Sequence, residues 1–274
     1  MIKAVKSLVP WEQSIPSKRQ TCSLSCLTAS GVLRQASSRE WFADIVQKLW
    51  KRVDDNDLPE DIRRLGLRSV EDLVRYLRMN TKKNLELYAT VWNKTIIGHF
   101  DSVKLSLFYQ FGGENLYNDG CALTDDHGNI KPKDIHAFVK QLKIEDFWLA
   151  ELYDDQYVYL QSLGYFDNYK YTKGLVRQAG NEKWVVLDNR PGRGVALPDK
   201  TFSIYGGAAH FWFGGMTFEE YIPKERFLSF TEAEEIIEFP NGIIYINLYK
   251  DMFKGHEPEA QRRQLAFREH LGLV

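Results

Sequence analysis

Two of the chain's three cysteines lie close together in a stretch with helical spacing. Cys22, Cys26, Ala29 and Leu33 recur at the spacing that places side chains on one face of an α-helix. Thr21 precedes them and can cap this helix, because its hydroxyl accepts a hydrogen bond from a free N–H of the first turn. Cys22 would then lie at the positive end of the helix dipole, which stabilises a thiolate and lowers the pKa of a thiol. The spacing therefore predicts a helix that begins at Cys22 and carries a nucleophilic thiolate, with Cys26 packed one turn deeper.

A histidine that could serve as the base for this thiolate lies much later in the chain. His210 follows Gly206, Gly207, Ala208 and Ala209, small residues that allow another element to approach closely. An apolar strand and two glycines come after it. A half-buried histidine on an aromatic-rich strand fits the same pattern, so both interpretations stay open. His136 falls off the apolar stripe of its own predicted helix and is expected to face solvent.

Helices are predicted to precede strands along the chain. Helical periodicity covers most of residues 21–79, and alternation typical of strands begins near residue 86. Residues 112–130 are rich in Asn, Asp and Gly and are predicted to form a long loop, after which Pro132 begins another helix. Strands continue from about residue 147. The chain is therefore predicted to be a single α+β domain over residues 1–274, with a helical half at about 1–80, a mostly antiparallel sheet half at about 85–250, and a C-terminal helix at about 257–271.

Composition excludes several classes of protein. The formal net charge of −1 does not indicate a nucleic-acid-binding surface. No apolar run reaches the ~18 residues of a membrane span, and Met1–Pro10 lacks the apolar core of a secretory signal. We therefore expect a cytoplasmic protein, or one exported without a cleaved signal peptide. Cys121 and His127 supply too few ligands for zinc, and no phosphate-binding or dinucleotide loop is present, so no metal or cofactor is predicted.

This order of elements, with a cysteine at the start of the first helix and a histidine on a later strand, resembles the papain-like cysteine peptidases. Pro10–Gln13 followed by Cys22–Leu27 is similar to the entry of the bacteriocin-processing and bacterial effector types. In those families a glutamine precedes the cysteine that opens the helix. Here Gln13 precedes Cys22 by a longer gap than usual, whereas Gln20 precedes Cys26 by the usual gap. The resemblance therefore leaves two pairings of glutamine with nucleophile.

The resemblance implies a role for each site residue. Cys22, or alternatively Cys26, would attack a carbonyl and His210 would transfer the proton. Asn247, at the end of the strand-like segment from Gly242, would orient the imidazole. Gln13 or Gln20 would hold the developing oxyanion.

A second alignment competes with this assignment. The segment from Lys183 to Asp188 resembles the strand that carries the catalytic histidine in the bacteriocin-processing peptidases, with Lys183 in the histidine's place. That alignment implies a broken triad and a degenerate domain that only binds.

The sequence thus predicts a thiol hydrolase that acts on an amide or peptide bond as a protease, deamidase or transamidase, with a protein or peptide as substrate. A bacterial effector or toxin fits this resemblance. The alternative is a catalytically degenerate papain-like protein, or another α+β protein, that recognises a protein partner. The oligomeric state is left open.

Overall fold

A computed structural model describes residues 22–29, 31–51, 53–80, 86–95, 99–111, 118–125, 128–155, 157–158, 176–178, 185–187, 194–196, 203–205 and 207–273. Its main feature is an antiparallel eight-stranded sheet in the order β11-β12-β10-β5-β1-β4-β3-β2. The strands are β1 (Cys22–Ala29), β2 (Glu86–Thr95), β3 (His99–Phe111), β4 (Asn118–Asp125), β5 (Phe147–Asp154), β10 (His210–Phe213), β11 (Glu235–Glu238) and β12 (Ile244–Asn247). Helices and an antiparallel sheet together confirm the α+β class.

Shorter strands and helices complete the described chain. Two small hairpins pair β6 (Val176–Gln178) with β7 (Val185–Leu187) and β8 (Gly194–Ala196) with β9 (Ser203–Tyr205). The helices are α2 (Ala36–Trp50), α3 (Glu60–Arg64), α4 (Val70–Met79), α5 (Pro132–Val139), α8 (Gly215–Glu220), α9 (Lys224–Leu228) and α10 (Pro258–Leu271). Short 3-10 turns cover Asp55–Asp57, Ile144–Asp146 and Met252–Lys254.

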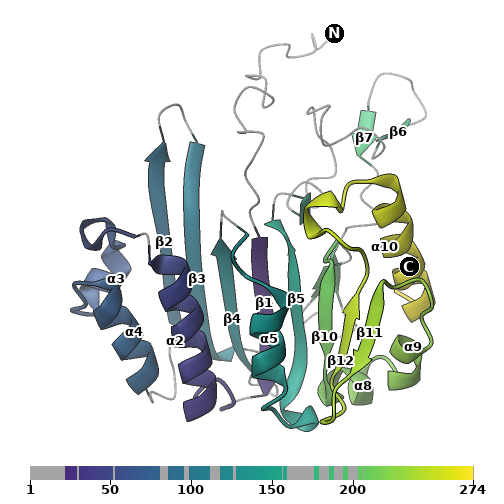
Figure 1. Ribbon diagram of the computed structural model, residues 1–274, viewed down its shortest axis with the longest axis horizontal. Helices are drawn as coiled ribbons and strands as arrows, with labels where there is room; N and C mark the ends of the chain where they lie inside the picture. Colours follow the sequence, from purple (N-terminus) through teal and green to yellow (C-terminus); the bar gives the residue numbers. More distant parts are fainter. Residues whose placement is uncertain are drawn as a thin grey trace.

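The first predicted helix is wrong, because Cys22–Ala29 forms the strand β1 between β4 and β5 (Figure 1). Residues four apart share a face in a helix and also in a strand, so the spacing of Cys22 and Cys26 fits both. The position of Ser23 shows that the segment is a strand. Its hydroxyl lies 2.8 Å from that of Thr124 across the strand pair, on the face opposite Cys22. The predicted order of helices first and sheet second is therefore corrected.

The predicted long loop at residues 112–130 is also wrong in part. Its section Asn118–Asp125 forms β4, which pairs with β1 and β3. The polar residues that suggested a loop lie at the two ends of this strand, and its middle carries Cys121 and Leu123, both in the core.

Helices cover both faces of the sheet around β10. Along β10, side chains alternate between the two faces, as in any strand. Phe211 and Phe213 pack against α9 and α10 through Phe227 and Phe267. Trp212 lies on the other face beneath α5, whose His136 ring meets it edge-on at 5.6 Å. This sandwich explains why every residue of β5 is buried, since β5 lies beside β10 and is covered on both sides.

Helix α5 is held in place over this face by α2. Trp41 of α2 stacks on Phe138 of α5 with ring centroids 3.9 Å apart, and its indole donates to the Asp134 carbonyl at 2.9 Å. At the other end of α5, the Asn241 side chain donates to the carbonyls of Val139 and Leu142, each at 2.8 Å. The two Asn241 contacts add a donor to carbonyls at and just beyond the C-terminal end of α5, where the helix leaves carbonyls without intrahelical partners.

Candidate functional site

The structure brings together two of the residues predicted for catalysis. His210 of β10 lies directly opposite Asn247 of β12 in the antiparallel register. Directly opposed residues in such a pair point to the same face of the sheet. Both side chains therefore lie on the face that α5 covers.

His210 is buried and held by one hydrogen bond. Its side chain is 8% exposed, and its Nδ1 lies 2.9 Å from the hydroxyl of Tyr245 on β12. Burial, with a smaller contribution from nearby His136, lowers the pKa of His210 to about 4. The imidazole is therefore neutral at neutral pH. Within the described part of the chain Nε2 has no hydrogen-bond partner, so this nitrogen remains for another group.

Three more side chains complete what we call the His210 cluster: His136, Trp212 and Tyr245, with His210 and Asn247. The His136 ring meets Tyr245 edge-on at 4.5 Å, and burial lowers the pKa of His136. Burial also raises the pKa of Tyr245, so its hydroxyl stays protonated. Within the described residues, His136 Nε2, Trp212 Nε1 and Asn247 Oδ1 are buried without a hydrogen-bond partner. Unpaired buried polar atoms are costly, and in native proteins each calls for an explanation such as a bound water or a functional role.

Cys22 has a raised pKa, whereas an activated thiol nucleophile has a lowered one. It is 0% exposed on β1 and lies across the ladder from Asp125 on one side and Asp154 on the other. Burial, and then the charge of Asp125, raise the pKa of the Cys22 thiol to about 12, despite an opposing N–H from Ile130. The thiol is therefore protonated at neutral pH. No helix dipole acts on Cys22, because β1 replaces the predicted helix.

The structure does not bring Cys22 and His210 together. Strand β5 lies between their strands, and its Leu152 is in register with both His210 and Leu24. Two strand spacings of about 4.8 Å and two residues of about 3.4 Å separate the Cα atoms of Cys22 and His210 by about 12 Å. No imidazole is among the groups that shift the pKa of Cys22.

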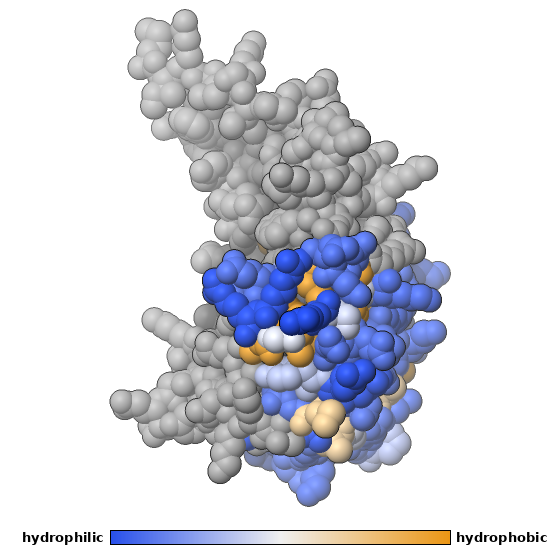
Figure 2. All heavy atoms as spheres, turned by 90° about the vertical axis from the view of Figure 1, so that its left-hand side faces the viewer, coloured by the Kyte–Doolittle hydropathy of each residue, from blue (hydrophilic) through white to orange (hydrophobic). Residues whose placement is uncertain are grey.

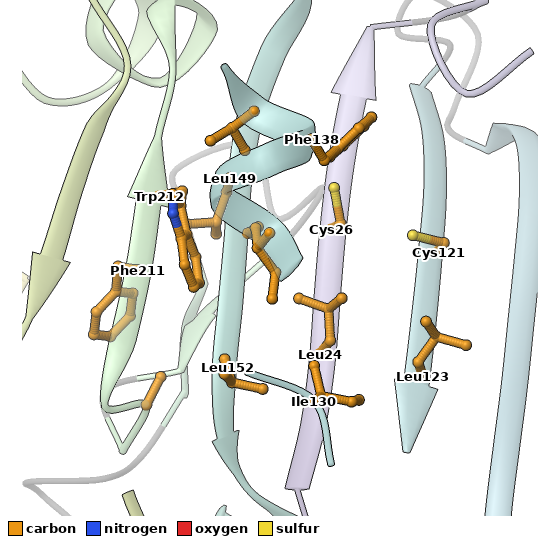
Figure 3. Close-up of a cluster of buried hydrophobic side chains, with 14 of the residues drawn as sticks. Leu24, Cys26, Cys121, Leu123, Ile130, Phe138, Leu149, Leu152, Phe211 and Trp212 are labelled. Carbon is orange, nitrogen blue, oxygen red and sulfur yellow. The ribbon is translucent and has the colours of Figure 1, made fainter. Parts of the chain in front are cut away.

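Cys26, the alternative nucleophile, lies in the core. It is directly opposite Cys121 of β4, and both are 1% exposed. Figure 3 shows both sulfurs among the side chains of Leu24, Leu123 and Phe138. The hydrogen bond between Cys121 and Cys26, together with burial, raises the pKa of Cys121. Gln13, Gln20, Lys183 and His127 lie outside the described residues.

Sequence reasoning missed three members of the cluster. His136 was expected to face solvent, but it is half-buried against Trp212, Phe239 and Tyr245. That expectation is wrong because α5 is enclosed between α2 on one side and the sheet on the other, so its apolar stripe is not its only covered face. The alternation along β12 places Tyr245 on the same face as Asn247, and this signal could have identified it.

The cluster offers hydrogen-bonding groups and two imidazoles, His136 and His210, whose pKa values burial lowers. Within the described residues, no group of three or more His, Cys, Asp or Glu side chains is placed to hold a metal ion. Among the same residues, no helix has the length and apolar character needed to cross a membrane.

No protein-family model matches the chain, and a search of curated proteins finds no match.

Proposed function

We propose that this chain works by binding a protein partner, as an α+β protein in which the cysteines are structural. The observation that carries this proposal is the state of Cys22. A thiol that is 0% exposed, with its pKa raised to about 12 and no imidazole beside it, is unsuited to attack a carbonyl.

The partner surface that we propose lies on the outer side of α3 and α4, where Leu65, directly after α3, and Met79, the last residue of α4, are exposed. Leu65 is 40% exposed and Met79 is 71% exposed, and partly buried Leu67 and Val70 pack against the core nearby in the chain. Figure 2 views this side of the molecule and shows hydrophobic atoms surrounded by hydrophilic ones. Apolar anchors within a polar rim are typical of protein interfaces. We call Leu65 and Met79 the α3–α4 anchors.

Alkylation of the native chain, measured separately for each cysteine, tests whether the Cys22 thiol is protonated and unreactive. At neutral pH a thiol with a pKa near 12 has about a thousandth of the thiolate of an ordinary cysteine, so Cys22 is expected to react at least about a thousandfold more slowly than a free thiol. Unfolding in urea should restore the ordinary rate and serves as the control. A Cys22 that reacts faster than a free thiol below pH 7 would overturn the proposal.

Charge substitutions test the partner surface. The double variant Leu65→Lys/Met79→Lys should no longer cross-link to a partner protein that the wild-type chain captures in extracts of its native source. Leu228→Lys is the matched control, because Leu228 is 41% exposed on α9, away from the α3–α4 anchors. If all three proteins capture the same partner equally, this surface is not the binding site.

A second candidate function is amide hydrolysis or transfer, as in a papain-like protease, deamidase or transamidase of the effector type. It is supported by the position of His210, which lies opposite Asn247 with its Nδ1 beside the Tyr245 hydroxyl. Turnover of amide substrates that is abolished by both Cys22→Ala and His210→Gln would establish this function in place of the first. Turnover that neither substitution changes would exclude these residues.

A further inference from the structure

The two edges of the eight-stranded sheet differ in how they are protected. Strand β11 forms one edge and is only four residues long, and its terminal Glu235 and Glu238 are both exposed. Ion pairs surround it: Lys224 with Glu238 at 2.5 Å and, just before the strand, Arg263 with Glu234 at 2.5 Å. Short, charged edges of this kind prevent pairing with another strand.

Strand β2 forms the other edge of the described sheet, and it is longer than β11, with its charges only at Glu86 and Lys94 near its ends. It is ten residues long, and among the described residues it pairs only with β3 (Figure 1). Its middle, Leu87–Trp92, contains no charge, proline or glycine and is rich in residues that favour strands. Such a segment on a sheet edge is a template for a further strand.

Helix α3 comes close to β2 but is too short to cover it. Five residues of α-helix extend about 7.5 Å, whereas ten residues of strand extend about 34 Å. Most of the β2 edge therefore stays beyond the reach of α3.

We propose that β2 is a self-association surface, at which β2 of one copy pairs antiparallel with β2 of a second copy and joins two sheets into one. The sequence of β2 is complementary to itself about Thr90. In an antiparallel pair related by a two-fold axis through Thr90, Glu86 of one copy lies opposite the partner's Lys94. The same register sets Tyr88 opposite the partner's Trp92.

This register is selected by charge. Glu86 and Lys94 are the charged residues of β2, and centring the pair on Thr90 places each opposite the other in both halves of the dimer. Opposite charges and aromatic pairs that face each other across strands stabilise the pairing, whereas like charges destabilise it. This inference does not depend on the α3–α4 anchors or on the state of Cys22.

A charge exchange tests the proposal on the full chain. Sedimentation across a range of concentrations should show a dimer for wild type. Glu86→Lys or Lys94→Glu alone places like charges opposite each other twice per dimer and should raise the dissociation constant about tenfold or more. The double variant, Glu86→Lys with Lys94→Glu, has the wild-type composition and should restore dimerisation. Circular dichroism should show the same folded spectrum for all four proteins.

Cysteine cross-linking tests the register independently. Thr90→Cys places two thiols opposite each other at the two-fold axis, so mild oxidation should link the chains. Glu86→Cys is the matched control, because two copies of residue 86 would lie about 27 Å apart, eight residues at about 3.4 Å each. The wild-type chain under the same oxidant controls for Cys22, Cys26 and Cys121.

Each outcome decides the proposal. A wild-type dimer that the single variants weaken and the double variant restores supports it. A chain that stays monomeric at all concentrations overturns it. A dimer that the charge variants leave unchanged, or that cross-links equally through residue 86, overturns it as well, because the interface then lies elsewhere or in another register.

Discussion

The buried state of His210 predicts a specific loss of stability in acid. The imidazole has a pKa of about 4 in the folded chain, and an ordinary histidine in an unfolded chain has a pKa of about 6.5. Protonation therefore favours the unfolded state. The stability that depends on neutral His210 is complete above pH 6.5 and is lost as the pH falls from 6.5 to 4.

The size of this loss follows from the two pKa values. At about 1.4 kcal/mol for each tenfold difference in proton affinity, the full loss is about 3 kcal/mol, of which about 2 kcal/mol is lost by pH 5. Carboxylates also titrate in this range, so the useful quantity is a difference. His210→Gln removes the titrating group, and the free energy of unfolding of wild type minus that of the variant should fall by about 2 kcal/mol between pH 7.5 and pH 5.

Urea denaturation at a series of pH values measures this difference. His270→Gln is the matched control, because His270 lies on α10 and contacts the Arg226 carbonyl rather than the His210 cluster. That variant should keep the acid-dependent loss seen in wild type. A wild-type-minus-His210→Gln difference that stays constant from pH 7.5 to pH 4.5 would refute a neutral, buried His210.

Three further substitutions have expected effects on the free energy of unfolding. Tyr245→Phe removes the hydroxyl beside His210 Nδ1 and should cost about 1–3 kcal/mol at pH 7.5 in urea denaturation, because a buried nitrogen loses its partner; an unchanged midpoint would show that this hydrogen bond contributes nothing. Asn241→Ala leaves the carbonyls of Val139 and Leu142 without its amide and should cost a similar amount, whereas Asn241→Asp, which cannot donate, should not rescue it. Gly214→Ala would place a Cβ 2.0 Å from the Phe147 carbonyl oxygen and should cost about 3 kcal/mol or more by thermal unfolding, and a melting temperature equal to that of wild type would show that β5 can move aside.

The helices could largely be predicted from the sequence, because their signals are local. Ser69 and Asp72 have the spacing of a capping box, and the Ser69 hydroxyl accepts from the Asp72 N–H at 3.0 Å at the start of α4. Pro132 begins α5 as expected, and Gly272 ends α10 in the left-handed conformation with φ of 76°. In α4 and α5 an apolar stripe accompanies these terminal signals, whereas the polar helix α10 is identified by Pro258 at its start and Gly272 at its end.

The two misassigned strands are those whose neighbours are distant in sequence. Nothing local distinguishes Cys22–Ala29 from a helix, since the positions of Cys22 and Cys26 satisfy both periods. Pairing with β4 and β5 makes this segment a strand, and the paired residues of those strands come 89 or more residues later in the chain. The composition of Asn118–Asp125 predicts a loop, because turn-forming residues lie at both of its ends and its apolar centre is short.

Only the part of the candidate site on the neighbouring strands β10 and β12 could be predicted from the sequence. His210 and Asn247 meet because both occupy strands that alternation identified, and these strands are neighbours. The relation of either to Cys22 depends on β5 lying between them, which strand order alone determines. Alternation along β12 places Tyr245 on the face of Asn247, whereas the burial of His136 depends on how α5 packs on the sheet in three dimensions.

The position of β1 has a consequence for synthesis of the chain. This strand emerges from the ribosome before every other strand of the sheet, yet its two partners are β4 and β5. Chains grow at about 5–20 residues per second, so both edges of β1 stay unpaired for several seconds until β4 and β5 have been synthesised. During that interval it can pair with β1 of a neighbouring nascent chain, and late, non-local pairing of this kind slows folding. The strand at the centre of the finished sheet is thus the one that stays unpaired longest while the protein is being made.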